Sequence, residues 1–174
     1  VLKGKGKRVA LLDLGAKRNI AKSLQHRGCA VTVYPAHTTA EEILAAEPDG
    51  IMLSNGPGDP KECGEIIAEI KKLYESGVPI FAICLGHQLM ALANGADTYK
   101  MKYGHRGGNH PVKDLETGRV YISSQNHGYV VDVRSMDPAV AVPAFTNVND
   151  GTNEGLKYVG KPVFTVQFHP EACP

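Results

Sequence analysis

The chain has no large excess of charge of either sign, no long apolar run and no closely spaced pair of cysteines. Nineteen Lys and Arg residues stand against eighteen Asp and Glu residues, so no strong field draws the protein to nucleic acid or to an anionic membrane. No apolar stretch approaches the roughly 20 residues needed to cross a bilayer, and no apolar signal core opens the chain. We therefore expect a cytoplasmic protein that binds neither nucleic acid nor membranes.

The four cysteines are spread along the chain without a CxxC pair, which suits a reducing compartment better than a disulfide framework. A length of 174 residues, without internal repeats or low-complexity segments, fits one domain. The Lys- and Gly-rich start indicates a linker over residues 1–7, followed by the domain over residues 8–174.

Short apolar runs alternate with helical patterns in the first half of the chain. Thr39 offers an N-cap with Glu42 three residues later, which predicts a helix to Ala46. Strands are expected over residues 8–13, 30–34, 50–54 and 80–83, and helices over residues 18–27, 40–46, 65–75 and 86–94. This order predicts an α/β fold with a mostly parallel central sheet flanked by helices, in which sites form beyond the carboxyl ends of the strands.

The pattern changes after residue 94, where helical periodicity gives way to short strands and turns. Strands are expected over residues 120–124, 129–133, 140–145 and 162–167, with a turn at Asn149-Asp150-Gly151. The C-terminal half is therefore predicted to be rich in β-structure.

Cys84 ends an apolar strand and is followed at once by Leu85-Gly86-His87-Gln88. A nucleophile is often placed at such a strand-to-helix turn, because the turn exposes its side chain beside free backbone N–H groups. Those N–H groups can stabilise a thiolate and hold an oxyanion after attack on a carbonyl, which suggests acyl transfer. Gln88, one helical turn later, either faces a polar substrate or is an ordinary solvated residue.

The last predicted strand leads directly into His169-Pro170-Glu171. Pro170 restricts the backbone there, so a stiff corner presents both side chains just past a strand end. His169 is the candidate base for Cys84, and Glu171 the candidate group that orients its imidazole. The alternative is that His169 is an ordinary surface histidine.

A third motif, Asn55-Gly56-Pro57-Gly58-Asp59-Pro60, follows the strand over residues 50–54. Its backbone amides could supply a second oxyanion donor or bind a substrate carboxylate. A plain tight loop is the alternative.

In this order, the motifs at residues 55–59, 84–88 and 169–171 resemble those of the class I (triad) glutamine amidotransferases. The segments at residues 12–20, 104–112 and 125–129 are further similar to the glutaminase domain of the carbamoyl-phosphate synthetase small subunit. The resemblance covers essentially the whole chain. Compared with that family, Ala82 stands where glycine is often found, Tyr129 where phenylalanine is common, and the family's N-terminal domain and C-terminal tail are absent.

The resemblance implies hydrolysis of L-glutamine to glutamate and ammonia through a thioester at Cys84, with His169 as acid/base and Glu171 as its orienter. It implies an oxyanion hole from the amides of Leu85 and Gly58. Substrate binding is implied for Gly56, Gln88, Asn126, Gly128 and Tyr129. Ammonia would pass to a large synthetase subunit that uses ATP and bicarbonate, in the pyrimidine and arginine pathways, and no cofactor is expected in this chain.

Other functions stay open at this point. The chain could serve another synthase, of the anthranilate or GMP type, or be a non-catalytic docking or glutamine-sensing domain. The segment at residues 105–112 favours carbamoyl phosphate synthesis, and the three triad residues argue against a docking module. No metal site is expected, because the spacing of His105, His110 and His127 follows no common ligand pattern.

Overall fold

The computed structural model describes residues 8–14, 30–54 and 59–168, without the side chains of residues 102, 103, 105–109, 124 and 126. The described residues form a nine-stranded sheet in the order β2-β1-β3-β4-β9-β8-β7-β5-β6. Its parallel half consists of β1 (Arg8–Asp13), β2 (Ala30–Pro35), β3 (Gly50–Leu53), β4 (Ile80–Ile83) and β9 (Val163–Val166).

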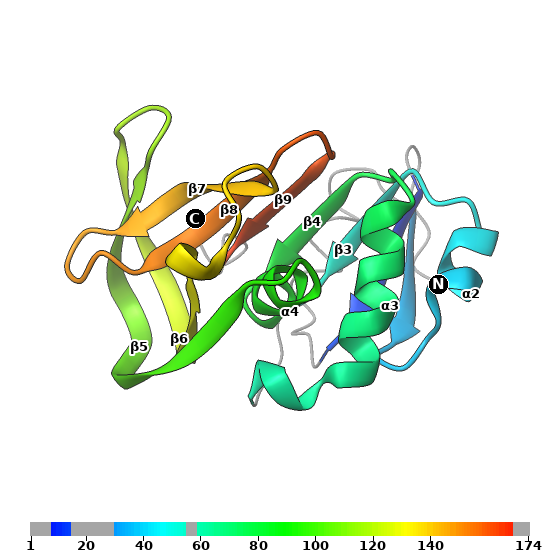
Figure 1. Cartoon of the computed structure of the whole chain (residues 1–174), viewed down its shortest axis with the longest axis horizontal. Coiled ribbons are helices and arrows are strands. Elements are labelled where there is room, and N and C mark those ends of the chain that lie inside the picture. Colours follow the sequence, from blue (N-terminus) through cyan, green and yellow to red (C-terminus); the bar gives the residue numbers. More distant parts are fainter. Residues whose placement is uncertain (1–7, 15–29, 55–58, 169–174) are drawn as a thin grey trace.

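The second half of the sheet is antiparallel and continues from β9. It consists of β8 (Asn153–Tyr158), β7 (Ala141–Asn147), β5 (Asp97–Asp114) and β6 (Val120–Asp132). Figure 1 shows the two halves side by side, with the parallel strands on the right and the antiparallel strands on the left. The α/β class, the parallel central sheet and the strand-rich C-terminal half are confirmed.

The helices in the described residues are α2 (Ala40–Ala45), α3 (Gly64–Glu75) and α4 (Leu85–Ala93), with 3₁₀ turns η1 (Pro60–Glu62) and η2 (Val133–Ser135). Helix α2 begins where its cap predicts, since the Thr39 side chain accepts a hydrogen bond from the Glu42 N–H at 3.3 Å. Helix α3 buries Ile66, Ile70, Leu73 and Tyr74, the four residues that its apolar spacing selects. The helix expected over residues 18–27 lies outside the described residues.

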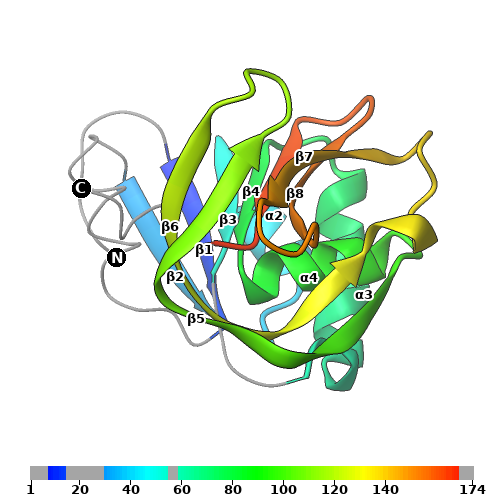
Figure 2. The ribbon, with the colours of Figure 1, turned by 90° about the vertical axis from the view of Figure 1, so that its left-hand side faces the viewer.

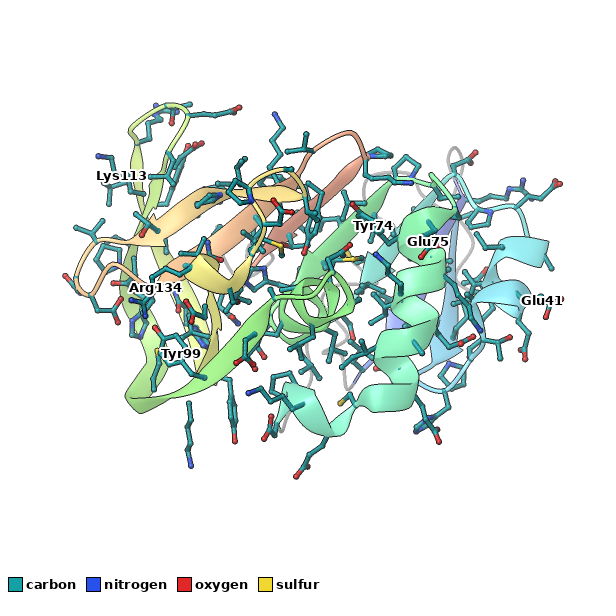
Figure 3. The ribbon with its side chains drawn as sticks, viewed as in Figure 1. Glu41, Tyr74, Glu75, Tyr99, Lys113 and Arg134 are labelled. Atoms are coloured by element: carbon teal, nitrogen blue, oxygen red, sulfur yellow. The ribbon has the colours of Figure 1, made fainter. Side chains whose placement is uncertain are left out.

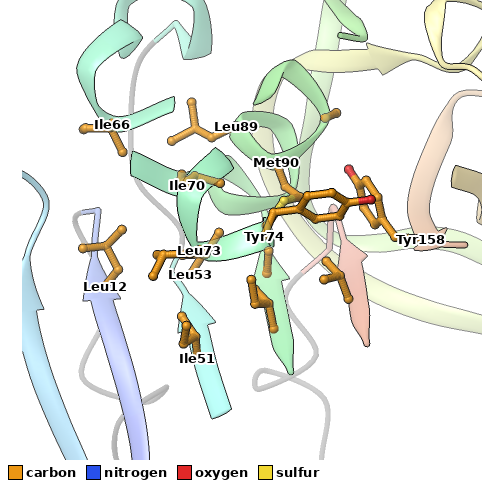
Figure 4. Packing of buried hydrophobic residues seen from close by; sticks show 14 of the residues in the cluster. Leu12, Ile51, Leu53, Ile66, Ile70, Leu73, Tyr74, Leu89, Met90 and Tyr158 are labelled. Atoms are coloured by element: carbon orange, nitrogen blue, oxygen red, sulfur yellow. The ribbon is translucent and has the colours of Figure 1, made fainter. Parts of the chain in front are cut away.

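Helices α3 and α4 pack on one face of the parallel strands and enclose the main core (Figure 4). Leu12, Ile51 and Leu53 from the strands meet Ile70 and Leu89 from the helices. Full burial of each such side chain stabilises the fold by about 1.5–3 kcal/mol. Tyr74 and Tyr158 meet edge to face, with ring centroids 5.6 Å apart, where the core reaches the antiparallel half.

A second apolar cluster lies on the opposite face of the sheet. Successive strand residues point to opposite faces, so Leu12 belongs to the main core whereas Leu11 joins Ile83, Val166 and Phe168 in the second cluster. Cys84 belongs to this second cluster too. The central parallel strands β1, β3, β4 and β9 are therefore covered on both faces, as their near-continuous apolar sequences predict, whereas Val33 of the edge strand β2 is 43% exposed.

Strand predictions in the C-terminal half were wrong at three places. The strands expected over residues 120–124 and 129–133 form the single strand β6, and β5 and β8 were not predicted. Strand β5 contains Gly104, Gly107 and Gly108 and two register shifts, so it lacks a regular apolar alternation. Strand β8 lies between β7 and β9, so polar residues such as Asn153 and Glu154 are buried there.

The hairpin of β5 and β6 projects from the antiparallel half, as Figure 2 shows from that end of the molecule. Tyr99, Lys113 and Arg134 carry their side chains on the outside of this half (Figure 3). In the part of the chain that the structure describes, no helix has both the length and the apolar character that a membrane span requires.

We predict that Gly86→Ala lowers the free energy of unfolding by about 1–3 kcal/mol, because crowding in a packed interior forces backbone shifts. A Cβ at Gly86 would lie 2.7 Å from Leu53 Cβ and 2.8 Å from Leu53 O. Gly64→Ala at the start of α3 is the control, since its Cβ would have no neighbour within 4 Å. Urea denaturation measures both, and equal stability of the two variants would contradict the close packing of α4 on β3.

Candidate functional site

Cys84 lies between β4 and α4, at the strand-to-helix turn that the sequence predicts. Its backbone has φ 52° and ψ −107°, in a region that non-glycine residues rarely adopt. Such strain costs about 1–3 kcal/mol and is typical of nucleophile turns. The Cys84 N–H donates a 2.9 Å hydrogen bond to Val166 O, so the turn is fixed to the end of β9.

The start of α4 is held against the ends of β1 and β3 by Ser54. Gly86 N–H donates to Ser54 O at 3.2 Å, and Ser54 Oγ accepts a 2.7 Å hydrogen bond from Leu14 N–H. Leu85 is the first residue of α4, so its N–H has no acceptor within the helix. This geometry suits the expected oxyanion role of Leu85.

The expectation that the turn exposes Cys84 is wrong for this structure, because only 4% of the residue is accessible. The side chain packs in the second cluster with Ile83, Val166 and Phe168, and the amide of Gln167 contacts its sulfur. The sulfur is therefore covered by neighbouring groups in this structure.

Gln88, Tyr129 and Gln167 form a chain of amide hydrogen bonds that ends at this sulfur. Gln88 Nε2 donates to Tyr129 O and to Gln167 Oε1, both at 2.8 Å. Gln167 Nε2 in turn donates to Cys84 Sγ at 3.5 Å. The predicted nucleophile Cys84, the predicted substrate residue Gln88 and the backbone of β6 are thus connected by hydrogen bonds.

A second polar network lies behind Tyr129 and contains His127. Its Nδ1 contacts Tyr129 O at 2.8 Å and its Nε2 contacts Gln125 Oε1 at 2.7 Å. Since an oxygen faces each ring nitrogen, the arrangement suits a doubly protonated imidazolium. The Glu154 carboxyl group lies 4.0 Å from His127 Nε2 and accepts a hydrogen bond from Gln125 Nε2, so it belongs to the same buried network.

His87 lies one turn into α4 and is fully buried. Its Nδ1 contacts Thr165 Oγ1 at 2.7 Å, and within the described residues its Nε2 has no hydrogen-bond partner. Burial lowers the pKa of His87 to about 3, and the nearby charge of His127 acts in the same direction. His87 is therefore neutral at physiological pH.

The structure brings together Cys84, Gln88 and Tyr129 among the predicted site residues, with Leu85 beside them. Gly128 precedes Tyr129 in β6, where it is half-buried. Asn126 lies in β6 opposite Arg106, but its side chain is not described. The other predicted site residues, Gly56, Gly58, His169 and Glu171, lie outside the described residues.

The sequence reasoning did not single out Gln167 or Ser54. Gln167 is buried and directly follows β9. The sequence feature that could have identified it is a polar residue at the end of an otherwise apolar predicted strand. Ser54 was visible only as the last residue of a predicted strand.

The family model of class I glutamine amidotransferases matches residues 10–174. This chain belongs to the class I glutamine amidotransferases.

Curated relatives are similar over nearly the whole chain. The carbamoyl phosphate synthase small chain of Symbiobacterium thermophilum is 55% identical over 172 residues, which cover 98% of this chain and 47% of that protein. The carbamoyl phosphate synthase small chain of Caulobacter vibrioides is 57% identical over 167 residues, covering 95% of this chain and 43% of that protein. The chain thus spans somewhat less than half the length of these relatives.

Solved structures confirm the fold. A proposed GMP synthase subunit from Thermoplasma acidophilum matches with a TM-score of 0.83 at 22% identity, covering 95% of this chain and 85% of that one. A glutamine amidotransferase from Thermotoga maritima matches with a TM-score of 0.74 at 20% identity, covering 95% of this chain and 76% of that one.

We predict that acid destabilises the wild type partly through His87. The unfolded chain takes up a proton at this residue below pH 6.5, whereas the folded protein does so only near pH 3. Between these values, His87 lowers the free energy of unfolding by about 1.4 kcal/mol per pH unit as the pH falls.

Urea denaturation at pH 7 and pH 5 of the wild type and of His87→Gln measures this effect. As the pH falls, the free energy of unfolding should decrease more for the wild type than for His87→Gln, because glutamine does not titrate. Thr165→Val keeps His87 and should retain the wild-type pH dependence. Parallel pH profiles of wild type and His87→Gln would contradict the burial of a neutral imidazole.

Proposed function

We propose that the chain is a glutaminase that hydrolyses L-glutamine to L-glutamate and ammonia and supplies that ammonia to carbamoyl phosphate synthesis. The observation that carries this proposal is the strained turn that places Cys84 at the N-terminus of α4, beside the end of β9. Membership in the amidotransferase family and the names of the curated relatives support the substrate and the pathway.

In the proposed reaction, the Cys84 thiolate attacks the side-chain carboxamide carbon of glutamine and forms a C–S bond. The negative charge on the carbonyl oxygen is held by the N–H groups of Leu85 and Gly58. His169 protonates the nitrogen and the C–N bond breaks. Ammonia departs, and a γ-glutamyl thioester remains on Cys84. Water activated by His169 then hydrolyses the thioester, while Glu171 orients the imidazole.

Recognition of the amino acid is proposed for Gly56, Gln88, Asn126, Gly128 and Tyr129. Gln88 has a restricted part in it, because both N–H groups of its amide already donate to Tyr129 O and Gln167 Oε1. Gln88 therefore meets the substrate as an acceptor, through Oε1. An N–H of the substrate's amide or ammonium group is the matching donor.

Ammonia is proposed to pass to the large subunit of carbamoyl phosphate synthetase, which would hold ATP and bicarbonate. The small-chain names of the relatives support this partner, and this chain is proposed to need no cofactor or metal of its own. The pyrimidine and arginine pathways would use the product, and a cytoplasmic location fits that role.

We predict that Cys84→Ala and Cys84→Ser reduce ammonia release from glutamine by at least about a thousandfold, because each removes the sulfur that forms the thioester. Cys63→Ser is the control: Cys63 is half-buried, and burial, with Glu62 and Asp59 nearby, raises the pKa of its thiol. It should keep wild-type turnover. A diazo-ketone analogue of glutamine should label the wild type once, as intact mass shows, and labelling that survives Cys84→Ala would remove the assignment.

We also predict that the chain alone turns over glutamine slowly and that addition of a large synthetase subunit raises kcat. The physical reason is the burial of Cys84, which requires a rearrangement before substrate reaches the sulfur. Steady-state ammonia release with and without the subunit measures the effect. Equal rates would show that the covering groups move freely without a partner.

A further inference from the structure

We propose that Gln167 is a positioning residue for the nucleophile: its side-chain amide, oriented by Gln88, donates a hydrogen bond to Cys84 Sγ and stabilises the thiolate. The assignment deepens the proposed glutaminase function and rests on it for its catalytic meaning. The hydrogen bond from the Gln167 amide to the sulfur of Cys84 can be tested by a measurement that needs no glutamine.

The orientation of both side-chain amides follows from one backbone carbonyl, Tyr129 O, at which this series of hydrogen bonds ends. Tyr129 O can only accept, so the Gln88 atom that contacts it at 2.8 Å is the nitrogen. The same nitrogen contacts the Gln167 side chain at 2.8 Å, so the Gln167 atom there is the oxygen. The remaining end of the Gln167 amide, its NH₂ group, therefore faces the sulfur at 3.5 Å.

Neighbouring backbone bonds hold Gln167 in this place. Its N–H donates to Glu154 O at 2.9 Å, and the preceding residue, Val166, accepts from Cys84 N–H at 2.9 Å. The residue has 0% of its surface accessible, so its amide does not exchange freely with water. Donor and sulfur are thus fixed by adjacent strands rather than by a surface loop.

A donor in this position favours the charged form of the sulfur. Removal of the sulfur from water disfavours the thiolate, and a hydrogen bond to the charged form opposes that effect. The titratable groups on the described parts of the surrounding elements include Asp13 of β1, His87 of α4, His110 of β5, His127 of β6 and Glu154 of β8. Replacement of Gln167 leaves all of these in place, so a changed titration can be assigned to the lost donor.

The test measures the rate of alkylation of Cys84 by iodoacetamide from pH 5 to pH 10, followed by mass spectrometry of the peptide that contains Cys84. Gln167→Met removes the donor at similar volume, and we expect it to raise the midpoint of the profile by about one pH unit, that is, a tenfold slower reaction at fixed pH below the midpoint. Gln167→Glu keeps an oxygen for Gln88 but replaces the donor with a carboxylate, and it should raise the midpoint further.

Thr165→Val is the matched control, because it removes a buried hydrogen bond to His87 two residues away on the same strand. It should leave the alkylation midpoint at the wild-type value even if it lowers thermal stability. Unchanged midpoints in both Gln167 variants, or an equal rise in Thr165→Val, would overturn the positioning role. Because alkylation needs no glutamine, this result is separate from the ammonia assay, and either assignment can fail while the other stands.

Discussion

The parallel pairing of β4 with β9 sets the geometry on which the site depends. Ile83 lies opposite Val166, so the residue after each strand meets its counterpart at the same edge: Cys84 beside Gln167. Parallel strands share their carboxyl-end edge, and the chain leaves β9 toward His169 at the edge where β4 delivers Cys84. Residues more than eighty positions apart in sequence are brought together by four pairs of backbone partners.

The turn at Cys84 combines two costs that the surrounding structure must offset. The positive φ is unfavourable for a residue with a side chain, and burial removes the sulfur from water. Three contacts compensate: the bond of Cys84 N–H to Val166 O, the close packing of Gly86 on Leu53, and the amide of Gln167. The strained backbone at Cys84 is thus held by contacts with β9, β3 and α4 together.

The parallel half of the fold could be predicted from sequence because local signals agree there. Apolar runs, the cap at Thr39 and the apolar stripe of α3 each specify one structure, and the structure has it. The turn at Cys84 could be predicted for the same reason, since an apolar strand runs directly into a helix.

The antiparallel half could not be predicted to the same degree. Burial in β8 is decided by its neighbours β7 and β9, and not by its own polar sequence, so Glu154 looks like a surface residue until the topology is known. The role of Gln167 likewise depends on Gln88 and Tyr129, which come from other elements. The predicted exposure of Cys84 was wrong because a turn specifies only the direction of a side chain. The residues that cover this side chain come from parts of the sequence far from the turn.

The hydrogen bond from Gln88 to Tyr129 O joins two distant parts of the sheet order, since β6 stands at the far edge of the antiparallel half while α4 follows β4 in the parallel half. Strand β6 is therefore connected to the sulfur of Cys84 by hydrogen bonds through two side-chain amides, those of Gln88 and Gln167. The position of Tyr129 O on β6 therefore sets the direction of the Gln88 amide and, through it, the direction of the Gln167 amide at the sulfur of Cys84.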